Sequence, residues 1–266
     1  MNLETSENRK ASPSGAESAT CVAAGLRLPL IYFLLLAVVA GGIFLGIYKT
    51  AFPIYEVPAA LLKSFPSVEE AQKRDETFRF ATTLHITAGM AILGGLLAAL
   101  LGMGEAWASQ PNRGAFIRAG IGVVIAALAG LSGGLAGALF AIPLEPLNAS
   151  YPMARTILVH GVMLGLMSAG VGLAVGWVAG SGRMAGLSAG TSFASGVLAA
   201  LLFPLFGAFV VPQLQVDAIV PDGSRGVFGC VGSEGVWGMI LWIAFASIIL
   251  GLMLPLMNRA PKKSGP

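Results

Sequence analysis

Charged residues are scarce in this chain of 266 residues, since only 11% are Asp, Glu, Lys or Arg while 56% are apolar. An ordinary soluble domain carries roughly 25% charged residues. The scarcity excludes a water-soluble globular enzyme with a normal surface, and the high apolar content excludes disorder of the whole chain. The net charge of +3 is scattered and forms no basic run, which argues against nucleic acid as a partner.

Cysteine is nearly absent as well, with Cys21 and Cys230 as the only two. Two cysteines cannot build a disulfide framework, and the sequence has no Cys-x-x-Cys pair or Cys/His cluster with zinc spacing. It also lacks a Ser/His/Asp arrangement, a phosphate-binding loop and a dinucleotide fingerprint. No catalytic residue is therefore predicted, and the sequence does not favour an enzyme.

Six uncharged apolar windows fill most of the chain. A helix needs about 20 apolar residues to cross a bilayer, and the windows do not alternate as the strands of a membrane barrel would. We therefore predict an all-α integral membrane protein. A polar, disordered tail (1–27) precedes a six-helix transmembrane domain (28–258), and a short basic tail (259–266) follows it. The predicted spans are about 28–48, 80–103, 119–142, 156–179, 184–211 and 235–257.

The positive charges predict the orientation of the spans. With the N-terminus inside, nine Lys and Arg residues lie in inner segments and seven in outer loops. This bias favours an arrangement with both termini inside, in the cell (inner or plasma) membrane. In the first outer loop, Ser67-Val68-Glu69-Glu70 is a capping box, which predicts a helix that runs on into the second span. Pro221-Asp222-Gly223 predicts a turn in a small outer hairpin.

Glycine is abundant, with 36 residues, and much of it lies within the spans. Glycines four positions apart share one helix face and let two helix backbones approach closely, so they predict tight helix packing. The short turn Gly180-Ser181-Gly182 predicts an antiparallel hairpin of the fourth and fifth spans. The second and third spans also resemble the fourth and fifth, which raises the hypothesis of a duplicated two-helix unit. The spaced pairs are Gly42/Gly46, Gly130/Gly134, Gly133/Gly137, Gly161/Gly165, Gly172/Gly176 and Gly186/Gly190.

No Asp, Glu, Lys or Arg lies inside any window, which argues against a proton or ion pump. The only two histidines, His85 and His160, both lie inside windows, and Arg79 and Arg155 precede them by six and five residues. The predicted orientation places both imidazoles at a similar depth near the outer surface. Two imidazoles can supply the axial ligands of a b-type haem, and two arginines can pair with its propionates. Cofactor binding by these four residues is therefore one hypothesis, with the histidines as haem iron ligands.

A local resemblance carries the same implication. Leu158-Val159-His160-Gly161-Val162-Met163 resembles the haem-carrying helix with the His-Gly-x-x-Met pattern in catalytic subunits of haem–copper oxidases. The segment Arg79–His85 is similar to the arginine and Leu-His pattern of related helices. The likeness covers about a dozen of the 266 residues, and the further histidines that bind that family's second haem and copper are lacking. The resemblance implies a single low-spin haem site without oxygen reduction.

Several functions remain open at this point. The protein is either a haem-binding electron-transfer protein or respiratory-type accessory subunit, or a non-catalytic membrane subunit that serves a partner complex. A passive permease for a small solute is a third reading, and a quinone or metal site at the histidines is another. The expected partners are the lipid bilayer and either a membrane protein or a second copy of the chain. Permease-lining candidates are Thr82, Ser132, Ser168 and Ser192, and predicted interface anchors are Trp177, Trp237, Trp242, Tyr48, Tyr55 and Tyr151.

Overall fold

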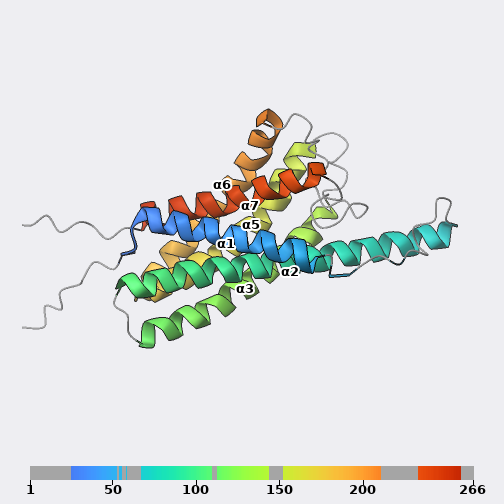
Figure 1. Cartoon of the computed structure of the whole chain (residues 1–266). Coiled ribbons are helices and arrows are strands. Elements are labelled where there is room, and N and C mark those ends of the chain that lie inside the picture. The colour runs from blue at the N-terminus through green and yellow to red at the C-terminus, as the bar shows by residue number, and fades with distance from the viewer. Residues whose placement is uncertain are drawn as a thin grey trace, which may run out of the picture.

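Six long helices form the protein in a computed structural model, which describes residues 25–52, 54–55, 58, 67–109, 113–143, 152–210 and 233–258 (Figure 1). Each helix contains a segment that is long and apolar enough to cross a membrane. The prediction of an all-helical, multi-pass membrane protein is therefore confirmed. The helices are α1 (Leu30–Ala51), α2 (Val68–Ser109), α3 (Arg113–Ala141), α5 (Pro152–Val178), α6 (Gly182–Val210) and α7 (Ser233–Met257).

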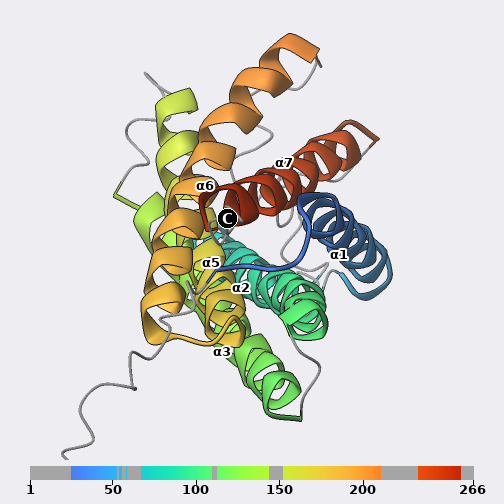
Figure 2. The ribbon, with the colours of Figure 1, turned by 90° about the vertical axis from the view of Figure 1, so that its left-hand side faces the viewer.

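Helix α5 is the most covered of the six. It packs against α2, α3 and α6, whereas α1 lies at the edge of the bundle beside α2 and α7 (Figure 2). The side chains of Met163 and Met167 on α5 and Leu93 on α2 are fully buried. Trp242 on α7 is only 2% exposed, so its predicted role as an interface anchor is wrong. Its indole packs within the bundle, where its ring centroid lies 6.3 Å from that of His160 on α5.

Helix α2 is unusually long, and its first turns extend beyond the other helices (Figure 1). Its 42 residues correspond to about 63 Å, roughly twice the thickness of a bilayer's hydrocarbon core. The capping box is present, since Glu70 N–H donates to Ser67 Oγ at 3.2 Å and Ser67 N–H donates to Glu70 Oε2 at 2.9 Å. The predicted helix from this box into the second span is confirmed.

Glycines hold two of the helix pairs, α2 with α3 and α5 with α6, at close range. A Cβ atom at Gly130 or Gly134 of α3 would collide with the backbone of α2 at Met90 or Thr87. A Cβ atom at Gly172 of α5 would likewise collide with the backbone of α6 at Ser188. Lipid gives no hydrophobic drive for helix association, so this close packing is a main source of cohesion. The predicted role of these glycines is confirmed.

The turn between α5 and α6 is tight. Helix α5 ends at Val178 and α6 begins at Gly182, with Gly180 between them at a φ of 111°. That backbone conformation favours glycine because it lacks a Cβ atom. Ser181 Oγ accepts the N–H of Met184 at 3.1 Å and so satisfies one of the first donors of α6. The predicted hairpin of the fourth and fifth spans is confirmed.

Two glycine faces take no part in packing within the bundle. Gly42 and Gly46 form the α1 glycine face, and Gly182, Gly186 and Gly190 form the α6 glycine face. All five are exposed, and a Cβ atom at any of them would meet no other atom within 4 Å. Glycines four residues apart therefore pack against neighbouring helices on α3 and α5, whereas on α1 and α6 they leave an open surface.

Other predictions fall outside the described residues. The expected hairpin around Pro221-Asp222-Gly223 lies there, as do residues 1–24 of the predicted tail. The last residues of that tail are described, and Leu26 N–H donates to the carbonyl of Asn258 at 2.9 Å. The orientation in the membrane and the duplication of a two-helix unit stay predictions.

Candidate functional site

His160 lies on α5, one helical turn after Thr156. Its Nδ1 is 2.9 Å from the Thr156 carbonyl oxygen, and the residue is 1% exposed. A carbonyl only accepts, so Nδ1 carries the hydrogen, and in a neutral imidazole Nε2 then holds a lone pair. This pairing fixes both the tautomer and the orientation of the ring.

The imidazole of His160 sits where three helices meet. The ring centroids of Phe203 on α6 and Trp242 on α7 each lie 6.3 Å from it, in edge-to-face orientations. Nε2 has no hydrogen-bond partner within the part of the chain that the structure describes. Next to His160, Gly161 is buried, and a Cβ atom there would meet nothing within 4 Å. The site therefore presents a directed lone pair that no described protein group uses.

His85 on α2 has a different environment. Its Nε2 accepts the backbone N–H of Tyr55 at 3.0 Å, and the ring of Phe52 packs edge-on at 5.9 Å. Phe52 in turn stacks on Tyr48 at 4.7 Å. The imidazole thus ties the chain that leaves α1 to the side of α2. Its Nε2 lone pair already has a protein donor.

The two predicted arginines also differ. Arg79 is exposed on α2, whereas Arg155 is only 8% exposed. Arg155 Nη2 donates to the carbonyl of Ala141, the last residue of α3, at 3.3 Å. A cation at this position satisfies a terminal carbonyl and complements the helix dipole. Thus His85, His160 and Arg155 contact three different parts of the bundle.

Glycines on the two histidine-bearing helices, α2 and α5, are covered by protein. A Cβ atom at Gly94 would lie 2.8 Å from the carbonyl oxygen of Ala126 on α3. One at Gly165 would lie 2.9 Å from the ring of Phe193 on α6. These glycines serve contacts between helices.

The hydroxyls predicted to line a permease do not share one surface. Ser132 is exposed on α3 and donates to the carbonyl of Leu128 at 2.9 Å, so it faces outward from the bundle. Ser192 is buried against α5, where its Oγ would collide with a Cβ atom at Gly172. Thr82 and Ser168 are buried on α2 and α5. Among these described residues, the polar groups form no single track.

A buried carboxylate at the end of α2 is a feature that the sequence reasoning missed. Glu105 is fully buried, and its oxygens accept the backbone N–H groups of Arg27 and Leu28 at 3.0 and 3.1 Å. Ser109 Oγ donates to the same carboxylate at 2.7 Å, and Arg27 Nη1 donates to the Ser109 carbonyl at 2.8 Å. We name these four residues the Glu105 clasp. In the sequence, Glu105 is an acidic residue directly after a long apolar window. Such a residue also marks the ordinary end of a membrane span, so the pattern alone did not indicate a buried carboxylate.

Comparison with known proteins gave no matching family model, no matching curated protein and no matching solved structure. Within the described residues, no three His, Cys, Asp or Glu side chains are grouped in a way that could hold a metal ion. The function is therefore argued from the geometry of the bundle alone.

Proposed function

We propose that this protein is a non-catalytic membrane subunit that docks transmembrane helices of a partner on its open glycine faces. The observation that carries this proposal is the α6 glycine face. Gly182, Gly186 and Gly190 follow one another at four-residue spacing on the outer side of α6, with no atom near their Cβ positions. Small residues at this spacing let a second helix approach closely.

The surroundings of this face fit a docking surface. The large side chains of Leu187 and Phe193 stand beside the glycines and are 53% and 42% exposed. Small residues next to exposed apolar side chains allow a facing helix to pack closely on this side of α6. The opposite side of α6 already packs on α5 through Ser188 and Ser192. Helix α6 therefore has one face within the bundle and one available to a partner.

The histidines support the same reading. His85 holds the chain after α1, and His160 packs between rings of α6 and α7. Both imidazoles thus have contacts that stabilise the bundle, as expected for a structural subunit. The hydroxyls of Thr82, Ser132, Ser168 and Ser192 form no single track, so a permease has less support than a structural subunit.

Gly190→Ile tests the docking surface. A Cβ atom at this position meets no atom within 4 Å, so the thermal stability of the purified protein is expected to stay unchanged. Crosslinking from a photoreactive amino acid at Leu187, in native membranes and with mass-spectrometric identification, is expected to give one dominant protein partner. That crosslink should fall at least tenfold in Gly190→Ile.

Gly120→Ile on α3 is the matched control, because Gly120 is also exposed with nothing within 4 Å of its Cβ position. It is expected to leave the crosslink intact. Crosslinking to lipid alone, or equal loss in both variants, would contradict the proposal.

We propose b-type haem binding as a second candidate function, because the Nε2 lone pair of His160 has no protein donor. Ligating histidines commonly donate their other ring N–H to a backbone carbonyl, as His160 does to Thr156. His160 fits one axial ligand, and a bound haem would supply one-electron transfer. His85 fits the second position only if its bond to Tyr55 opens. Arg155 lies on the same helix as His160 and would supply the cation that pairs with a haem propionate.

An absorption spectrum of the detergent-purified protein, expressed with ample haem and then reduced with dithionite, tests this candidate. A shifting Soret band with sharp α and β bands is expected, and both should vanish in His160→Ala. Retention of these bands in His85→Ala would indicate that His160 is the only histidine ligand. A featureless spectrum of the native protein would rule the haem out.

A further inference from the structure

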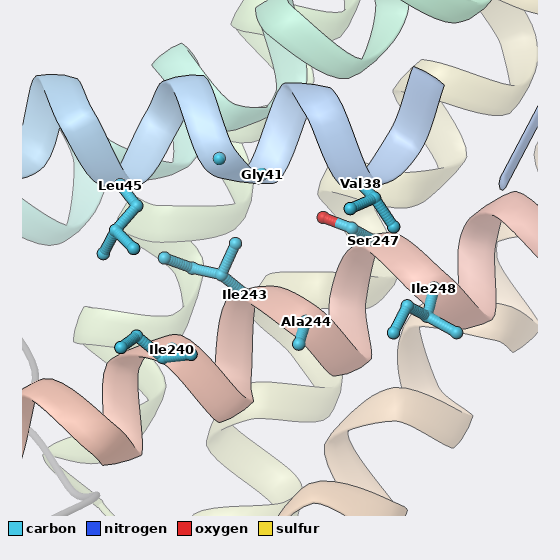
Figure 3. Close-up of a pocket in the computed structure, with 9 residues that line it drawn as sticks. Val38, Gly41, Leu45, Ile240, Ile243, Ala244, Ser247 and Ile248 are labelled. Atoms are coloured by element: carbon cyan, nitrogen blue, oxygen red, sulfur yellow. The ribbon is translucent and has the colours of Figure 1, made fainter. Parts of the chain in front are cut away.

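A groove runs between α1 and α7 about midway along α1 (Figure 3). Its volume is about 190 Å³. An apolar cavity of about 150 Å³ is already large enough to bind benzene, so this groove has room for several methylene groups of a hydrocarbon chain. We name it the α1–α7 groove; its walls are Val38, Gly42, Leu45, Ile240, Ala244 and Ile248.

The floor of the groove is closed by contacts within the chain. A Cβ atom at Gly41 would lie 2.9 Å from both Ile243 Cγ2 and Ser247 Oγ. Ser247 is the only polar side chain among the lining residues, and it is 1% exposed. Because Gly41 covers its hydroxyl, the accessible surface of the groove is aliphatic. Such a surface accepts hydrocarbon and offers a polar ligand no hydrogen bond.

The groove is closed at one end and widens toward the other. On the side where α1 begins, Gly251 of α7 packs on α1, and a Cβ atom at Gly251 would lie 3.0 Å from Ala37 Cβ and 3.3 Å from Leu34 Cα. Figure 3 shows the two helices diverging toward Leu45 and Ile240. The groove therefore opens toward the end of α1.

A cation lies beyond the open end. Lys49, in the last turn of α1, follows Leu45 by four residues and Val38 by eleven, so the three side chains share one face of the helix. Lys49 is exposed, and its ammonium makes no ion pair or hydrogen bond within the part of the chain that the structure describes. Val38 and Lys49 are about 16 Å apart along the helix axis. That distance is about half of the ~30 Å hydrocarbon core, which is the depth of one lipid leaflet.

We propose that the α1–α7 groove binds one acyl chain of a phospholipid whose anionic head group pairs with Lys49. The aliphatic walls contact the chain, and the packing at Gly251 stops it near the middle of the membrane. The ammonium then lies at the depth of the head group of the same molecule, and basic residues at the membrane surface attract anionic lipids. A helix with its side chains is about 10 Å wide, so only single side chains of a docked helix would enter the groove, whereas an acyl chain follows its length.

This inference goes beyond the proposed function, because the observation that carries that function is the α6 glycine face. Gly42 lines the groove, so a bound lipid covers this part of the α1 glycine face and leaves the α6 glycine face to a partner helix. The two ideas therefore fail independently of each other.

Photoreactive phospholipids test the proposal on the full chain, reconstituted in vesicles of phosphatidylcholine and phosphatidylglycerol. A diazirine is placed on the acyl chain of one lipid in one sample and of the other lipid in a parallel sample, and mass spectrometry locates the labelled residues. The groove is expected to take about fivefold more label from phosphatidylglycerol than from phosphatidylcholine, the ratio that one lysine near the membrane surface supplies. It is also expected to take several times more label than the outer side of α3 around Val124 and Leu128, which are both 58% exposed.

Two substitutions separate the head group from the chain. Lys49→Gln is expected to remove the preference for phosphatidylglycerol, and Lys49→Arg is expected to keep it. Gly42→Leu places a large side chain in the wall of the groove and is expected to lower its labelling by both lipids at least fivefold. A Cβ atom at Gly42 meets no atom within 4 Å, so the melting temperature of this variant should stay unchanged. Gly120→Leu, which adds the same side chain to another open position on α3, is the matched control and should leave labelling of the groove intact.

Equal labelling of the groove and of the outer side of α3 would overturn the proposal. A preference for phosphatidylglycerol that survives Lys49→Gln would overturn it as well, as would a photoreactive amino acid at Val38 or Ile248 that crosslinks to protein instead of lipid. The α6 crosslink and its loss in Gly190→Ile are measured separately, so any of these results leaves the proposed function standing.

Discussion

Glu105→Ala is expected to lower the free energy of unfolding by about 2–4 kcal/mol. The substitution removes the acceptor for the N–H groups of Arg27 and Leu28 and for the hydroxyl of Ser109. A buried donor left without an acceptor costs about 1–3 kcal/mol, and hydrogen bonds to a charged group are stronger than neutral ones. Unfolding in mixed micelles of detergent and SDS, followed by tryptophan fluorescence, gives this value.

The Glu105 clasp also holds Arg27 and Leu28, which lead into α1, against α2. Loss of the clasp is therefore expected to expose this segment to protease. Trypsin is expected to cleave after Arg27 several times faster in Glu105→Ala than in the native protein. Ser109→Ala removes one donor and leaves the two backbone bonds, so it should cost about 1 kcal/mol and leave cleavage nearly unchanged. Equal stability of Glu105→Ala and the native protein would show that the clasp contributes nothing.

Gly134→Leu on α3 is expected to cost about 3 kcal/mol or more. A Cβ atom at this position would lie 2.7 Å from the Cα atom of Thr87, so the backbones of α2 and α3 would have to separate. Overpacking against flexible side chains costs about 1–3 kcal/mol, and a backbone cannot move aside as a side chain does. The same unfolding titration, together with the detergent-dependent aggregation of the purified variant, measures the effect.

Gly120→Leu, on the same helix, is the control for this prediction. Gly120 is exposed and nothing lies within 4 Å of its Cβ position, so the larger side chain is expected to point away from the bundle. It is expected to change stability by less than about 0.5 kcal/mol, or to raise it slightly because leucine favours the helix. Similar losses in both variants would mean that glycine acts through helix flexibility rather than through contact with α2.

The histidines show how far sequence reasoning reached toward a site. Both lie on long apolar helices, as predicted, and their shared depth near the outer surface stays a prediction. The spacing could not tell which helix each ring faces. The structure places His85 against the chain after α1 and His160 against α6 and α7. A joint ligand role for the pair therefore stays a prediction, and His160 alone keeps a lone pair without a protein donor.

The glycine pairs give a similar lesson. Gly130/Gly134 and Gly186/Gly190 have the same spacing and similar neighbours in the sequence. The first pair faces the backbone of α2, and the second faces outward. Spacing fixes which residues share a face of a helix. The direction in which that face points depends on how the helices are rotated against one another.

The sequence by itself determined that this is a multi-pass helical membrane protein, with six long apolar helices among the described residues, that α2 begins at a capping box and that α5 and α6 form a hairpin. These features follow from local causes: the length of apolar windows, a side chain three residues from its partner, and a glycine turn. Only the tertiary structure decided that Glu105 holds Arg27 and Leu28, that Trp242 is buried and that two glycine faces stay open. Each of these depends on contacts between distant segments, which a pattern along one helix does not encode.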